Sequence, residues 1–168
     1  MIKLYCDGGL SLDGAKGFKP TENSVGAWAF IILKVDGKKE EILLEKSGAE
    51  VGTTNNKMEI TSAIEVLEAF NKLNISDKEI EVFSDSMYLI RGVTQWSVGW
   101  KRNNWRTQKD EPVKNKELWL HLLELDEKIK PKWIWVRGHS GDKYNEKCDV
   151  ECQCQMRKKK QELDAKKK

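Results

Sequence analysis

Four carboxylates occupy positions from which they could act together as one chemical site. Asp7 and Asp85 each follow a short apolar run that has the alternation of a β-strand. Glu59 stands near the start of one helical pattern, and Asp149 lies in the last helical pattern of the chain. If the strands that carry Asp7 and Asp85 are neighbours, both side chains leave the sheet at one edge, within reach of Glu59 and Asp149.

Each of these carboxylates also has an ordinary explanation. An Asp after a strand commonly serves as a turn residue or a cap, and Glu59 could be the glutamate of a capping box. Four converging carboxylates would raise one another's pKa values by repulsion. Divalent cations relieve that repulsion, and ligands that are all oxygen suit Mg²⁺ or Mn²⁺ better than Zn²⁺. Two such ions about 3.5–4 Å apart can hold both the attacking and the leaving oxygen of a phosphoryl transfer.

The apolar spacing predicts one mixed α/β domain around a central sheet. Strands are expected over residues 2–7, 25–35, 41–46, 79–84 and 133–136, and helices over 53–73, 87–93, 117–130 and from 144 onward. Asp36 and Gly37 give the turn signal of a β-hairpin. Because the strand ends of such sheets are where sites are built, the fold class agrees with a carboxylate site.

Composition limits the classes of protein that fit. The chain has 168 residues, of which 34% are charged, and no apolar run approaches a membrane span. Its N-terminus is unlike a signal peptide, and its four cysteines do not suggest a disulfide framework, so we expect a protein of the reducing cytoplasm.

Positive charge is concentrated in two segments. The net charge is +3, but residues 157–168 contribute +5 and the rest of the chain −2. A second basic segment, residues 96–116, has a net charge of +4 and is rich in tryptophan. Nucleic-acid contacts, if present, must therefore come from local patches. We expect the tail 157–168 to remain flexible and solvated.

An ordered set of motifs gives the chain a specific resemblance. The motifs lie at residues 7–9 (Asp-Gly-Gly), 53–59 (Thr-Thr-Asn-Asn-Lys-Met-Glu), 84–88 (Ser-Asp-Ser-Met-Tyr), 92–96 (Gly-Val-Thr-Gln-Trp), 100–105 (Trp-Lys-Arg-Asn-Asn-Trp) and 136–141 (Val-Arg-Gly-His-Ser-Gly). Together they resemble type 1 ribonuclease H over about residues 2–154. The resemblance implies a ribonuclease H-like fold, an α/β fold with a five-stranded mixed central sheet flanked by helices. Residues 1–156 would form the catalytic domain and residues 157–168 a basic C-terminal tail.

The resemblance also implies an activity. The protein would be a monomeric endonuclease that hydrolyses the RNA strand of RNA–DNA hybrids and leaves 5′-phosphate and 3′-hydroxyl ends. Two Mg²⁺ ions, for which Mn²⁺ could substitute, would be held by Asp7, Glu59, Asp85 and Asp149. His139 would assist proton transfer or product release, as an imidazole that titrates near neutral pH can do.

By the same resemblance, the substrate contacts fall on several short segments. Asn55 and Asn56 match amides that contact RNA, whose 2′-hydroxyl distinguishes it from DNA. Met87 matches a residue at the minor groove, and Thr54 and Asn115 match a pocket that grips a DNA phosphate.

Aromatic and basic side chains would complete the substrate surface. Tyr88, Trp96 and Trp100 match a channel against which DNA sugars pack, although Trp96 and Trp100, four residues apart, could equally pack a helix into the core. Lys101, Arg102 and Arg106, interleaved with Trp105, favour a basic handle over a buried patch, since such charges are rarely buried. His121 is interpreted as structural.

Some features depart from the family pattern. Asp7 is followed by Gly8 and Gly9, where the family commonly has a serine or a similar small polar residue, and the loop over residues 10–23 is longer than usual. The last helix has cysteines where small residues are frequent. A zinc site there is disfavoured, because steps of about 100° place Cys148 and Cys152 on one face and Cys154 far round the helix.

Two alternative functions remain open from the sequence. One is a catalytically weak hybrid-binding module, against which the intact carboxylate set argues. The other is a different nuclease of the same fold. A proofreading exonuclease would have Asp-X-Glu on the first strand, where Asp7 is followed by two glycines, and an integrase would have Glu in place of Asp149.

Overall fold

The computed structural model describes residues 1–11, 20–138 and 140–166. Five strands form one sheet: β1 (Ile2–Leu10), β2 (Val25–Asp36), β3 (Lys39–Val51), β4 (Ile80–Ser84) and β5 (Lys132–Trp135). Their order across the sheet is β3-β2-β1-β4-β5. The pairs β1–β2 and β2–β3 are antiparallel, whereas β1–β4 and β4–β5 are parallel. The expected five-stranded mixed sheet is confirmed, and its first and fourth strands are adjacent, which is the condition under which Asp7 and Asp85 meet.

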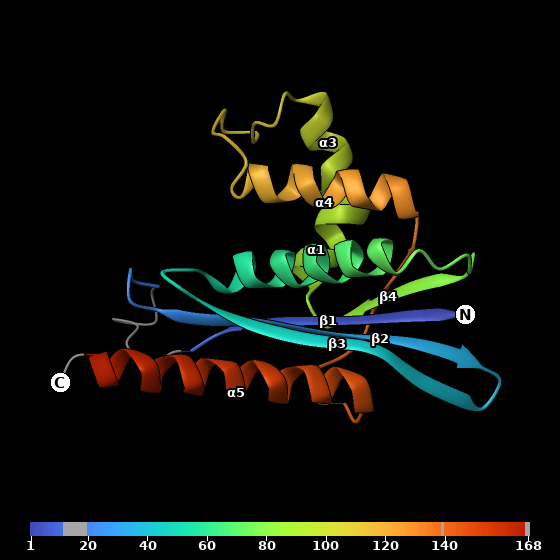
Figure 1. Ribbon diagram of the computed structural model, residues 1–168. Helices are drawn as coiled ribbons and strands as arrows, with labels where there is room; N and C mark the ends of the chain where they lie inside the picture. Colours follow the sequence, from blue (N-terminus) through green and yellow to red (C-terminus); the bar gives the residue numbers. More distant parts are fainter. Residues whose placement is uncertain (12–19, 139, 167–168) are drawn as a thin grey trace.

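Helices cover both faces of this sheet. On one face lie α1 (Asn55–Leu73), α2 (Met87–Arg91), the π-helical turn η1 (Gly92–Trp96), α3 (Ser97–Arg102) and α4 (Lys116–Ile129). Of the described helices, only α5 (Lys143–Lys166) covers the other face. Figure 1 shows α1 against the sheet with α4 stacked above it, and α5 on the opposite side.

The alternation of side chains along the strands divides the core in two. Leu4 and Cys6 of β1 belong to a large cluster with α1 and α4, while Tyr5 faces a smaller cluster with α5. Because β1 is buried on both faces, its sequence is apolar on both. This central strand is therefore held firmly in the position that carries Asp7.

The first strand extends further than the sequence predicts. β1 continues past Asp7 and pairs with β2 as far as Leu10 opposite Gly26. Asp7 thus lies within a strand and does not end one. The glycines after it resemble a turn signal, but hydrogen bonding to β2 keeps them extended.

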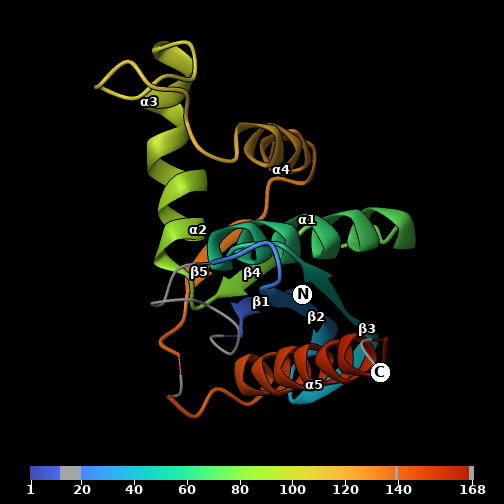
Figure 2. The same ribbon diagram turned by 90° about the vertical axis from the view of Figure 1, so that its left-hand side faces the viewer.

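A nearly continuous helical column follows β4. The predicted helix 87–93 is only its first part, because α2, η1 and α3 continue from one another to Arg102. Figure 2 shows this column rising beside α1 and α4. Gly92 allows the approach, since a Cβ there would lie 2.1 Å from Cη2 of Trp119 in α4.

The basic tail is helical, contrary to the flexible segment expected for it. α5 runs without interruption to Lys166, and residues 167–168 lie outside the described part of the chain. Met156 is buried and Leu163 packs against the smaller core cluster, so the sheet anchors this segment. None of the described helices is long and apolar enough to cross a membrane.

Candidate active site

Asp7 and Asp85 are brought together by the parallel pairing of β1 and β4. Tyr5 pairs with Phe83, so two residues further along both chains Asp7 and Asp85 stand at matching positions. Asp7 is only 6% exposed. Burial raises the pKa of Asp7 to about 9, together with the negative charges of Asp85 and Asp149, a hydrogen bond with Asp85 and the charge of Glu59. All four predicted carboxylates therefore share one electrostatic environment.

Glu59 projects into this environment from α1 and is not a capping-box residue. The N-cap is Thr54, whose Oγ1 accepts a hydrogen bond from the Lys57 N–H at 3.1 Å, so Glu59 lies beyond the third helical position. Its carboxylate accepts hydrogen bonds from Asn55 Nδ2 at 3.0 Å and from the hydroxyl of Ser86. Burial raises the pKa of Glu59, although these two hydrogen bonds favour its charged form.

Two further side chains that the sequence did not single out support the carboxylates. Ser86 is the N-cap of α2, and its Oγ also accepts from the Leu89 N–H at 3.0 Å, so it joins Glu59 to the end of β4. Asn145 of α5 is buried and donates from Nδ2 to Asp85 Oδ2 at 3.5 Å. Their positions in the sequence are the signals that could have found them. Ser86 is next to Asp85, and Asn145 lies one helical turn before Asp149.

Two glycines permit the close approach of the backbone around the site. A Cβ on Gly8 would lie 2.3 Å from the carbonyl carbon of Met58 and 2.5 Å from the Glu59 nitrogen. A Cβ on Gly138 would lie 3.2 Å from Asp85 Oδ2. Gly8 thus lets α1 rest directly on β1, which is how Glu59 comes near Asp7. Among the described residues, a Cβ on Gly9 would meet only the Cε of Met156, at 3.6 Å, which is an ordinary contact distance.

The donor atoms of the centre fit a hard cation. In residues 1–11, 20–138 and 140–166, no three Asp, Glu, His or Cys side chains form a ready-made group around one ion. The charged groups that raise the pKa of Asp7 are nevertheless all carboxylates, whose oxygens are the ligands that Mg²⁺ prefers. A bound cation would favour the charged forms that burial and repulsion now oppose.

An aromatic cluster lies on the helical column beside this centre. Trp100 packs against Trp119 and Trp105 with ring centroids 5.2 Å and 5.7 Å apart, and Trp119 is fully buried. Trp96 contacts Trp100 and Tyr88 but remains 38% exposed. The two interpretations of the tryptophans therefore both apply, since Trp100 packs into the core while Trp96 presents a ring to solvent.

The remaining predicted contact residues start helices or lie beside their starts. Asn56 and Met87 are exposed, whereas Asn55 is engaged with Glu59. Thr54 caps α1, and Asn115 precedes α4 in the left-handed backbone region, with φ of 62°. Asn115 Nδ2 donates to the Tyr88 hydroxyl at 3.3 Å, an acceptor it shares with Trp119 Nε1.

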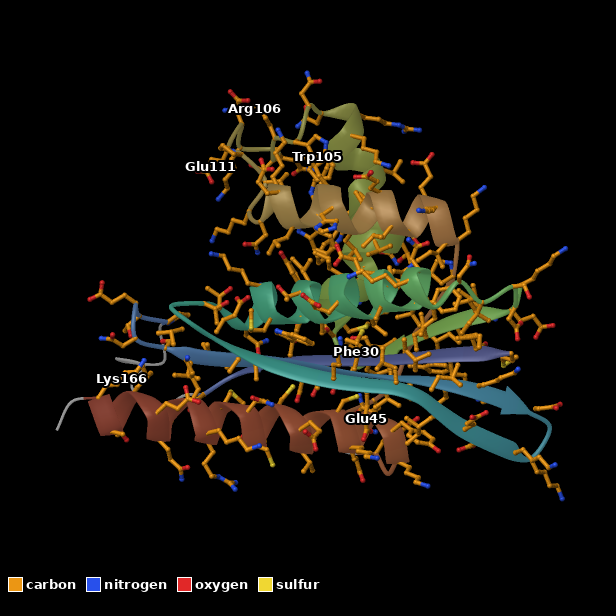
Figure 3. The ribbon with its side chains drawn as sticks, viewed as in Figure 1. Phe30, Glu45, Trp105, Arg106, Glu111 and Lys166 are labelled. Atoms are coloured by element: carbon orange, nitrogen blue, oxygen red, sulfur yellow. The ribbon has the colours of Figure 1, made fainter. Side chains whose placement is uncertain are left out.

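The basic residues of the predicted handle are not equivalent. Lys101 and Arg102 are exposed on α3. Arg106, labelled at the outer end of the molecule in Figure 3, donates from Nε to Asp110 Oδ1 at 2.6 Å and also bonds the Asp110 carbonyl. Together with Trp96, Arg106 lines a cavity of about 980 Å³.

The histidines and cysteines complete the comparison with the predicted site. His139 lies outside the described residues. His121 joins α4 to α1 through Nε2 at 2.5 Å from Glu68 Oε1, in keeping with its interpretation as structural. Cys148 and Cys152 are buried against β1, whereas Cys154 is partly exposed, so the three thiols do not converge. Cys152 Sγ lies 3.5 Å from the Asp7 carbonyl oxygen, to which the thiol donates.

The sheet order and the carboxylate centre define a nuclease-like α/β protein of the ribonuclease H-like fold. Among solved structures, LC9-RNase H1, described as a type 1 RNase H with the type 2 active-site motif, superposes with a TM-score of 0.78 at 22% identity, covering 92% of this chain and 71% of that chain. LC11-RNase H1, solved in complex with an RNA/DNA hybrid, gives 0.60 at 20% identity, covering 92% and 98%.

Sequence comparison then identifies the family. The RNase H family model matches residues 2–157. The ribonuclease H of Treponema denticola is 37% identical over 88% of this chain and 92% of its own length. That of Geotalea uraniireducens is 42% identical over 88% of each. The chain therefore belongs to the ribonuclease H family, and the expectation that it is a nuclease is confirmed.

Proposed function

We propose that this protein hydrolyses the RNA strand of RNA–DNA hybrids endonucleolytically and leaves 5′-phosphate and 3′-hydroxyl ends. The observation that carries the proposal is the gathering of three other carboxylates around Asp7, which is nearly buried and whose pKa is raised to about 9. A structural aspartate would gain nothing from three acidic neighbours. A centre that binds cations and a phosphodiester requires them.

Asp7, Glu59, Asp85 and Asp149 would hold two Mg²⁺ ions, with Mn²⁺ able to substitute. Bound there, the ions supply an activated water and charge stabilisation for the leaving oxygen. The protein's own contribution is to hold the carboxylates in place. Ser86 orients Glu59, and Asn145 reaches Asp85 from α5.

Residues around the centre would distinguish the two strands of the hybrid. Amides at Asn55 and Asn56, with Met87, would contact the RNA strand, where 2′-hydroxyls can accept and donate hydrogen bonds. The Asn55 side chain is near enough to the centre to bond Glu59, which supports an RNA strand that lies beside the carboxylates. His139, outside the described residues, would assist proton transfer or product release.

The DNA strand would lie along the helical column. Thr54 and Asn115 would grip a DNA phosphate, and Lys101 and Arg102 would attract the backbone. The sugars would pack on three aromatic side chains, Tyr88, Trp96 and Trp100. The exposed ring of Trp96 beside the exposed charges of α3 supports this arrangement.

The protein would act as a monomer in the reducing cytoplasm. Its four cysteines are free in the structure, and three of them are buried. We retain residues 1–156 as the catalytic domain, with residues 157–168 as its basic extension. The boundary between them lies within α5, so the two would not be separable by a flexible linker.

One cleavage assay tests this function. Labelled RNA–DNA hybrid, duplex RNA, duplex DNA and single-stranded RNA are each incubated with the protein in Mg²⁺ or in chelator. We expect cleavage of the RNA strand of the hybrid in Mg²⁺ alone. Binding without cleavage would favour the hybrid-binding module, and cutting of duplex DNA would favour another nuclease of this fold.

A further inference from the structure

The helix that supplies Asp149 continues well past the carboxylate centre. α5 is fixed on the sheet by the buried residues Asn145, Cys148, Cys152 and Met156. The Met156 Cε lies 3.6 Å from the position of a Cβ on Gly9, two residues after Asp7 in β1. From this point α5 runs on toward the side of the molecule at which α1 begins (Figure 1), and Figure 3 labels Lys166 at its end.

The two flanks of α5 face different parts of the molecule. One flank lies against β3, where Lys147 Nζ is 3.2 Å from Glu45 Oε2 and Gln155 Nε2 donates to Ser47 Oγ at 3.0 Å. The opposite flank carries Asp149, whose charge acts on Asp7. The β3 flank is therefore a packing surface, and the Asp149 flank borders the site.

One amide and two basic side chains continue the Asp149 flank beyond the site. Successive helical residues turn by about 100°, so Gln153, Arg157 and Lys160 all lie within about 80° of Asp149 around the axis. With a rise of 1.5 Å per residue, Arg157 stands about 12 Å and Lys160 about 16 Å further along. Arg157 is exposed and makes no hydrogen bond or ion pair with any described residue.

Lys158 provides an internal comparison. It is also exposed, but it is turned about 180° from Asp149, on the β3 flank. Both residues lie more than two helical turns before Lys166, the last residue of α5, so they are outside the last turn in which the helix dipole favours cations. The dipole therefore accounts for positive charge at neither position.

We propose that Gln153, Arg157 and Lys160 form a track that binds backbone phosphates of the nucleic acid leading away from the cleavage site. This inference rests on the proposed function, since it takes Asp149 to stand at the scissile phosphate. A duplex advances about 3.4 Å per base step, so Arg157 meets the backbone three to four steps away. Its guanidinium suits a phosphate because it can donate two parallel hydrogen bonds.

The test compares Arg157→Ala with Lys158→Ala in the full chain, after equal melting temperatures show that α5 is intact in both. KM and kcat for hybrid cleavage are measured over a range of salt concentrations. Arg157→Ala is expected to raise KM about three- to tenfold with kcat changed less than about twofold, and to flatten the slope of log affinity against log salt by about 0.7–0.9. Lys158→Ala should match the parent.

A second arm identifies the strand. Hybrids carry one neutral methylphosphonate linkage three or four nucleotides from the main cut, in either the RNA or the DNA strand. The parent should bind the hybrid more weakly when the neutral linkage is in one of the two strands and should be unaffected when it is in the other. Arg157→Ala should bind hybrids with and without the neutral linkage equally well.

Several outcomes would overturn the track. The first is an equal loss of hybrid affinity in Arg157→Ala and Lys158→Ala, and the second is no loss of affinity in either variant. The third is that every neutral linkage weakens hybrid binding by the parent and by Arg157→Ala to the same extent. In all of these the parent still cleaves the hybrid, so the proposed function stands. A parent that fails to cleave hybrid would remove the proposed function itself.

Discussion

The carboxylate centre and the helical column differ in how they affect the stability of the folded protein. At the centre, Asp7 is nearly buried among charges of its own sign, and its pKa is raised to about 9. On the column, by contrast, Trp100 packs against Trp119, and Lys101 and Arg102 extend into solvent. The folded state is therefore destabilised at the proposed catalytic centre and is undisturbed on the proposed substrate surface, as functional sites often show.

This difference predicts two kinds of mutant. Changes at the centre should abolish turnover and can stabilise the fold, because they remove repulsion. Changes on the column should weaken binding in a salt-dependent way and leave turnover nearly intact.

The largest effect is expected for Asp85→Asn. The amide keeps the shape of the side chain but removes a charge from the centre, so cleavage should fall by more than the 10–100-fold typical of residues that only support metal ligands. Hybrid binding, which depends on the column, should remain within about a few-fold of the parent. The measurement is hybrid cleavage beside a binding titration, with Asp36→Asn in the β2–β3 hairpin as control. Substantial Mg²⁺-dependent turnover by Asp85→Asn would refute its assignment.

The second largest effect concerns pH in the absence of metal. The raised pKa of Asp7 means that the folded protein holds this proton up to about pH 9, whereas an unfolded Asp loses it near pH 3.8. Between these values the folded state binds more protons, so the free energy of unfolding should fall as pH rises. In chelator, the melting temperature should drop by several degrees between pH 5 and pH 8, at roughly 2–4 °C per kcal/mol.

Asp7→Asn supplies the control for this pH effect. The variant lacks the titrating carboxyl, so its melting temperature should change less over the same range. If parent and variant show the same pH dependence, Asp7 does not carry the proton that the crowded centre implies.

A smaller effect is expected on the column. Lys101→Ala and Arg102→Ala should each flatten the salt dependence of hybrid binding by about 0.7–0.9 in slope if each side chain contacts one phosphate. Arg106→Ala should do less, because Asp110 already engages the guanidinium at 2.6 Å. Binding titrations at several salt concentrations measure all three. If Arg106→Ala gave the largest change in the slope of the three variants, this ranking would be wrong.

The smallest effect concerns the thiols, which do not take part in the proposed chemistry. Burial raises the pKa of Cys6 to about 12 and also raises the pKa of Cys148 and of Cys152, so these thiols should resist alkylation in the folded protein. Cys154 is partly exposed and should react first. Mass spectrometry after brief labelling counts the modified sites, with Cys154→Ser as control. Rapid labelling of Cys148 would show that α5 leaves the sheet readily.

The carboxylates could be predicted from the sequence because each one borders an apolar segment whose period is clear. Strand alternation placed Asp7 on the first strand and Asp85 directly after another, and left open whether those two strands are neighbours. The helical period likewise separated Cys154 from Cys148 and Cys152. These are local signals, and the structure agrees with them.

Features that depend on distant partners could not be predicted in this way. The glycines after Asp7 resemble a turn, but pairing with β2 extends the strand. Residues 157–166 resemble a solvated charge block, but the burial of Met156 and the packing of Leu163 keep them helical. Asn145 meets Asp85 only because α5 packs beneath β1 and β2, a placement that no local pattern contains.

The central claim is that the four carboxylates form one cation-binding centre, and a set of thermal scans tests it most directly. The parent and Asp7→Asn are each melted at pH 8 in chelator and in Mg²⁺. Mg²⁺ binds the folded state and should raise the melting temperature of the parent. Asp7→Asn should melt higher than the parent in chelator, gain less from Mg²⁺ and be inactive. If the variant instead melts lower in chelator and gains as much from Mg²⁺ as the parent, Asp7 has only a structural role and the four-carboxylate centre is wrong.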